Sequence, residues 1–77
     1  MPETLHFVQT FKKKGRALVG SPLEKCKTSD QARMRGLRAS DHSLGVLVFS
    51  VTGEPEFDEF DSPVLIASYG EVPEHFG

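Results

Sequence analysis

Long apolar runs, cysteine pairs and leader-like segments are all missing from this sequence of 77 residues. No apolar stretch approaches the ~18 residues that a membrane-spanning helix requires, so the chain is not expected to cross a membrane. The N-terminus lacks a basic flank followed by an apolar stretch, which predicts that no signal peptide is present. The single cysteine, Cys26, cannot form a disulfide within the chain. Together these absences favour a cytoplasmic, reduced location.

Basic residues are absent from the second half of the chain. All nine Lys and Arg lie within residues 1–40, where only three acidic residues oppose them and the formal charge is +6. Residues 41–77 hold eight acidic residues and no Lys or Arg, which makes the formal charge −8. Such an asymmetry can mark a nucleic-acid surface or an acidic tail. Because the charged runs are short and interspersed, we favour two halves that fold against each other and neutralise their charges.

The motifs that carry catalysis or zinc binding are also missing. No GxSxG, HExxH, CxxC or phosphate-binding glycine loop occurs. No motif places Cys26 beside a histidine that could act as its base, as a nucleophile requires. Zinc would need Cys26 to meet all three histidines, which are His6, His42 and His75. We therefore predict a non-enzymatic protein without a metal or cofactor, in which Cys26 is a small core residue.

The densest acidic stretch lies between two apolar segments and offers oxygen ligands of the kind that Ca²⁺ prefers. Its carboxylates belong to Glu54, Glu56, Asp58, Glu59 and Asp61. They lack the spacing of an EF-hand, with its central glycine and terminal glutamate. Phe57 and Phe60 interrupt the acidic residues and are expected to pin the loop to the body. We favour a solvated acidic loop that keeps the neighbouring strands soluble.

Four stretches predict strands. Val46–Val51 and Val64–Tyr69 are rich in β-branched and aromatic residues and are bounded by glycine, proline and acidic residues. Neither alternates apolar with polar residues, so both faces of each strand need cover. Leu5–Phe11 alternates with the two-residue period of a strand, and Arg16–Val19 is a short return strand after a lysine-rich turn.

One stretch predicts a helix. Thr28 and Gln31 have the spacing of a capping box, and the helix is expected to run to about Ser40. The order of elements predicts an α+β fold, a two-layer ββαββ sandwich in which one helix packs on a four-stranded, mainly antiparallel sheet. We expect a single domain over residues 1–77, with an ordered core over about residues 5–72, and two hairpins side by side. The expected core includes Phe7, Leu37, Leu44, Val46, Val48, Leu65 and Ala67.

The second half also carries a recognisable pattern. Gly45–Ser50 is followed by Gly53 and Pro55, then by the acidic stretch, by Pro63–Leu65 and by Tyr69–Pro73. This pattern resembles a family of small proteins from alphaproteobacteria, in which a strand ending in a Ser-x-x-Gly-x-Pro turn precedes a Pro-Val-Leu strand. No activity is established for that family. The resemblance therefore implies a fold and an origin, and it assigns no site residue.

One helix can cover only one face of such a sheet, which would leave an apolar patch exposed on the other face. We therefore predict a homodimer in which a second copy covers that patch. The expected dimer face consists of Leu47, Phe49, Val51, Val64 and Ile66. In the alternative arrangement, the C-terminal segment around Val72 and Phe76 covers this face in a monomer.

Two functions follow from these patterns. The leading prediction is a small non-enzymatic interaction module that self-associates and docks a protein partner. The alternative is a small nucleic-acid-binding protein that uses the basic first half. The residues expected to contact nucleic acid or a partner are Lys12, Lys13, Lys14, Arg16, Arg35 and Arg38.

Overall fold

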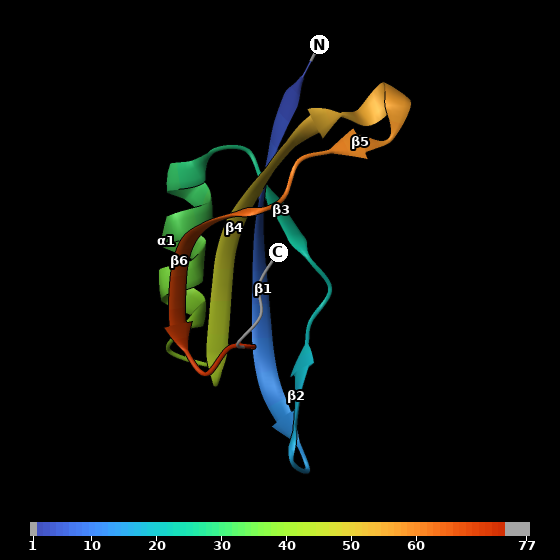
Figure 1. Ribbon diagram of the computed structural model, residues 1–77. Coiled ribbons are helices and arrows are strands. Elements are labelled where there is room, and N and C mark those ends of the chain that lie inside the picture. The colour runs from blue at the N-terminus through green and yellow to red at the C-terminus, as the bar shows by residue number, and fades with distance from the viewer. Residues whose placement is uncertain (1, 74–77) are drawn as a thin grey trace.

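The computed structural model describes residues 2–73, which form one α-helix, one 3₁₀ helix and six strands (Figure 1). The first four elements along the chain are β1 (Glu3–Lys14), β2 (Ala17–Gly20), β3 (Glu24–Cys26) and α1 (Ser29–Ala39). The others are β4 (Gly45–Glu54), the 3₁₀ helix η1 (Pro55–Phe57), β5 (Glu59–Phe60) and β6 (Val64–Gly70).

The sheet is built around two long antiparallel strands, β1 and β4. On its outer side β1 pairs with both β2 and β3, and β4 in turn pairs with both β5 and β6. Every pairing is antiparallel, and the sheet curls into a half-barrel (Figure 1). The α+β class and the two adjacent hairpins are thus as predicted, but the four-stranded sandwich is wrong. The prediction omitted β3 and β5 because strands of three and two residues are too short to show a period.

The helix begins where its capping box predicts. The Thr28 side-chain oxygen accepts the N–H of Gln31 at 3.0 Å, and the Gln31 side-chain oxygen accepts the N–H of Lys27 at 2.7 Å. The first bond satisfies a backbone donor that the first turn of a helix leaves free, and the second ties Gln31 to the residue before the cap. The predicted cap is therefore confirmed at Thr28, and α1 follows as a helix of 11 residues.

A narrow face of small residues lets α1 lie close on the sheet. Ala32 and Gly36 are buried, and a Cβ added at Gly36 would overlap Cγ2 of Val48 on β4. The prediction that Leu37 is buried is wrong, because each helical residue turns by about 100° and carries Leu37 off the small-residue face. The helix buries backbone rather than long side chains.

Both faces of β4 are buried within the chain, which explains why its sequence does not alternate. On the helix side lies a cluster of Val8, Cys26, Ala32, Val46 and Val48, with Ala39, Ile66, Ala67 and Tyr69 at its margin. On the open side, the face without a helix, lies a cluster of Phe11, Leu47 and Phe49, with Phe7, Leu18, Val51 and Val72 at its margin.

Two further core predictions are wrong. Leu65 and Leu44 are exposed, whereas Val46 and Val48 are fully buried as predicted and Phe7 and Ala67 are partly buried. Leu65 lies on the outermost strand, and Leu44 lies in the loop before β4.

Candidate interaction surfaces

The five residues of the expected dimer face do not share one surface. Leu47 and Phe49 are buried in the open-side cluster. The ring of Phe49 packs against that of Phe7, with their centroids 5.5 Å apart. Val51 is half-buried at the margin of the same cluster. Ile66 packs on the helix side instead, because a register shift opposite Val48 and Phe49 places it with Ala67 on that face.

The chain covers its own open side through a tight turn after β6. Gly70 adopts a φ of 68°, a conformation that favours glycine, and the Glu71 N–H then donates to the Leu44 carbonyl at 3.0 Å. Gly45 allows this approach, because a Cβ there would overlap the Glu71 carbonyl. The turn directs Val72 onto the open-side cluster.

The alternative to the dimer was a monomer in which the C-terminal segment covers the open side of the sheet. Val72 packs there as this alternative predicts. Phe76, the other residue of that prediction, lies outside the described residues. The face that we expected a second copy to cover is therefore occupied by the chain itself at Leu47 and Phe49.

The exposed apolar surface of the second half lies instead at the edge of the sheet. Val64 is 66% exposed and Leu65 is 48% exposed, and both belong to β6. Among residues 2–73, β6 pairs with β4 alone, so its outer backbone groups face no strand. Its seven residues, Val64–Gly70, include no charged residue and no proline.

The predicted basic residues divide into three groups. Lys13 lies on the open side and pairs with Glu71 at 3.8 Å between Nζ and Oε2. Arg35 pairs with Glu24, and it lines a shallow hollow on α1 together with Arg38. The remaining group, which is Lys12, Lys14 and Arg16, lies at the β1–β2 hairpin, and none of the three forms an ion pair with another described residue.

The two charge signs gather at opposite ends of an elongated molecule. Figure 1 shows the β1–β2 hairpin at one end and the η1–β5 loop at the other, along a principal axis of 41 Å. The hairpin carries the run of three lysines, and the loop carries the densest acidic stretch of the chain. The prediction that the halves neutralise each other therefore holds in the described chain only for the pair of Lys13 and Glu71. The prediction that Phe57 and Phe60 pin the acidic loop to the body is wrong, because they are 68% and 47% exposed.

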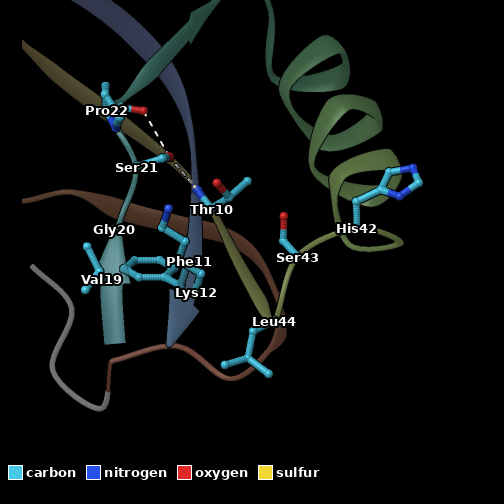
Figure 2. A pocket seen from close by; sticks show the side chains of 10 residues that line it. All are labelled: Thr10, Phe11, Lys12, Val19, Gly20, Ser21, Pro22, His42, Ser43 and Leu44. Carbon is cyan, nitrogen blue, oxygen red and sulfur yellow. Dashed lines mark hydrogen bonds between the residues drawn. The ribbon is translucent and has the colours of Figure 1, made fainter. Parts of the chain in front are cut away.

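A groove separates the β1–β2 hairpin from the loop that joins α1 to β4 (Figure 2). Its volume is ≈ 440 Å³. The lining residues are Thr10, Phe11, Lys12, Val19, Gly20, Ser21, Pro22, His42, Ser43 and Leu44. They supply one ammonium group, one imidazole and three hydroxyls, and no carboxylate. The sequence offered no signal for this groove, since its residues come from three separate stretches.

Hydrogen bonds hold one wall of the groove in place. Ser21 Oγ accepts the backbone N–H of Thr10 at 3.1 Å and donates to the Pro22 carbonyl at 3.1 Å. The Gln9 amide donates to the Ser21 carbonyl at 2.9 Å. The Ser21 N–H donates to the Thr10 carbonyl at 2.8 Å. Three of these bonds attach the segment that leaves β2 to β1, and the bond to the Pro22 carbonyl lies within the segment itself.

The sheet brings one histidine beside the cysteine, which no motif predicted. Cys26 on β3 and Ser50 on β4 are the register partners of His6 on β1. The His6 Nδ1 atom is buried without a hydrogen-bond partner, but Cys26 is itself a buried member of the helix-side core. Within residues 2–73 no group of three or more His, Cys, Asp or Glu residues is placed to hold a metal ion. His75, which a zinc site would also have required, lies outside those residues.

No helix in the described part of the chain has the length and apolar character needed to cross a bilayer.

Comparison with known proteins leaves these surfaces without a precedent. No family model matches the chain, and neither a curated protein nor a solved structure matches it. The resemblance of the second half to small alphaproteobacterial proteins therefore stays a prediction, and a function has to be argued from the surfaces themselves.

Proposed function

We propose that the protein is a small non-enzymatic interaction module that binds a second copy of itself at the β6 edge. Sheet edges in natural proteins are blunted by short strands, charges, prolines or covering elements, because an open edge pairs with other chains. The observation that carries the proposal is that β6 has seven residues without a charge or a proline, and that its apolar Val64 and Leu65 are exposed.

The other edges of the described sheet have the usual protection. On the far side the edge is divided between β2 and β3, which have four and three residues and are separated by Pro22. β5 has two residues and is flanked by acidic side chains. The irregularity at Ile66 shortens the regular part of β6, so the pairing we expect is brief and reversible.

Charge placement favours a second copy as the occupant. Two β6 strands that pair antiparallel about a twofold axis reverse the long axis of one molecule relative to the other. At each end of such a pair, the basic hairpin of one copy lies on the same side as the acidic loop of the other copy. Exposed charges at such separations add little affinity, but they orient the encounter and disfavour a parallel approach.

The expected affinity is modest. An edge contact of this size falls below the ~1,200 Å² of a standard interface, a class that contains transient complexes. We expect a monomer–dimer equilibrium in the micromolar range or weaker, which sedimentation equilibrium between about 10 µM and 1 mM resolves.

A matched pair of variants tests the location of this interface. Leu65→Lys places a charge on the β6 edge and should leave the protein monomeric throughout that concentration range. Leu23→Lys, at a position that is 49% exposed between β2 and β3, makes the same change elsewhere and should dimerise like the natural protein. A natural protein that stays monomeric at 1 mM, or equal effects of the two variants, would disprove the proposal.

A further inference from the structure

We propose that the groove between the β1–β2 hairpin and the α1–β4 loop binds the phosphate groups of a single-stranded nucleic acid. This inference concerns a different surface from the β6 edge and does not depend on self-association. It rests on the charges that line the groove, on the hydrogen bonds at the neighbouring helix end and on the apolar character of the groove walls.

The first observation is an unpaired cation above a groove that lacks carboxylates. The Lys12 side chain forms no ion pair or hydrogen bond with another described residue, and none of the ten lining residues is acidic. Figure 2 shows its side chain extending along the groove toward Ser21 and Thr10. The Thr10 and Ser43 hydroxyls add neutral donors beside it. A phosphate placed here gains a charge-assisted hydrogen bond from the ammonium group and further bonds from hydroxyls.

The second observation concerns the C-terminal end of α1, which borders the groove and would ordinarily repel an anion. Its last four carbonyls, those of residues 36–39, all accept hydrogen bonds. Ser40 bonds to the first two through its N–H at 3.0 Å and its Oγ at 2.6 Å. The N–H groups of Asp41 and His42 bond to the other two at 3.2 and 3.0 Å. No free carbonyl of this helix end is therefore left to oppose a phosphate.

The third observation is the apolar character of the walls. Val19, Pro22 and Leu44 line the groove and are exposed, so they offer an apolar surface to the sugar and base that accompany a phosphate. The volume of ≈ 440 Å³ lies within the ~300–1,000 Å³ typical of small-ligand sites, which is room for about one nucleotide.

The surroundings favour a chain of nucleotides over a single one. Lys14 continues β1 beyond Lys12, and Arg38 lies in the last turn of α1, where it lines the neighbouring hollow with Arg35. Neither Lys14 nor Arg38 forms an ion pair with a described residue. Successive phosphates can therefore contact cations beyond the groove itself, which a mononucleotide cannot do.

Two adjacent lysines provide the test, because strand alternation places them on opposite faces of β1. Binding of a fluorescein-labelled oligothymidylate of twelve nucleotides is measured by anisotropy at two salt concentrations. Lys12→Gln should weaken binding about tenfold and lower the salt slope by about 0.7, the effect of losing one phosphate contact on a single strand. Lys13→Gln removes the same charge from the open side and should change the affinity by less than about threefold.

A second pair of variants separates the groove from general electrostatics. Leu44→Glu puts a carboxylate in the groove and should abolish binding, whereas Leu23→Glu adds the same charge outside it and should retain most of the affinity. Circular dichroism verifies that each variant is folded. The Leu65→Lys variant should still bind, since the β6 edge is not involved.

Three results would overturn the proposal. One is the absence of binding at low salt, and another is an equal loss for the Lys12 and Lys13 variants. The third is thymidine monophosphate binding as tightly as the oligonucleotide, which would limit the site to one phosphate.

Discussion

The close approach of α1 to β4 predicts an unusual response to a glycine substitution. Gly36 lies inside a helix, where alanine is normally more stable than glycine by about 1 kcal/mol. At this position, however, an added Cβ would overlap Cγ2 of Val48 and lie 3.6 Å from Cγ1 of Val46. Both valines are fully buried and β-branched, so neither side chain can rotate away easily.

We therefore expect Gly36→Ala to destabilise the protein. Overpacking of a filled core costs about 1–3 kcal/mol, which outweighs the gain in helix propensity. The expected net loss is about 1 kcal/mol, or roughly 4–8 °C in the thermal midpoint of a domain of this size. Urea unfolding followed by circular dichroism at 222 nm measures the free energy directly.

A double-mutant cycle isolates the cause. Val48→Ala alone should cost about 2–3 kcal/mol because it leaves a cavity beneath the helix. In that background the overlap is gone, so Gly36→Ala should now stabilise the protein by up to about 1 kcal/mol. The sign of the alanine effect thus reverses between the two backgrounds. If Gly36→Ala stabilises the protein in both, the helix does not lie as close to β4 as the structure indicates.

Three further expectations follow from single features of the structure. Thr28→Ala should lower the free energy of unfolding in urea by about 1 kcal/mol, whereas Ser29→Ala should be nearly neutral. Equal losses for the two variants would contradict Thr28 as the helix cap. Gly45→Ala should lower the free energy of unfolding by about 2 kcal/mol, because a Cβ there displaces the turn after β6. It should also accelerate hydrogen exchange of the Glu71 amide, and an unchanged exchange rate would contradict this reasoning. Cys26 should react slowly with a thiol reagent in the native protein and quickly in urea, and rapid native labelling would show that it is accessible.

Local signals in the sequence predicted the elements that depend on neighbouring residues. The spacing of Thr28 and Gln31 located the start of the helix, since a capping box satisfies backbone groups within one turn. The apolar composition of β4 and β6 located both strands. The lack of alternation in β4 also showed correctly that both of its faces need cover.

The same signals could not predict which groups provide the cover. That depends on the turn at Gly70, which brings Val72 onto the open side, and on the irregularity that places Ile66 on the helix side. A shift of one residue in a strand exchanges its two faces, and periodicity cannot detect such a shift in a strand that is apolar throughout. The expected dimer face therefore included Leu47 and Phe49, which the chain buries by itself, and Ile66, which packs on the helix side.

The binding surfaces depend still more on the fold. The groove brings Lys12, Ser21 and Ser43 together from two strand regions and a loop, and no spacing within the sequence relates them. Residue types and their local order thus determined the helix, the long strands and the unequal charge of the two halves, because these features depend on neighbours in the chain. Only the tertiary structure decided which edge stays open, which cations stay unpaired and where the groove forms, because these depend on contacts between residues far apart in the sequence.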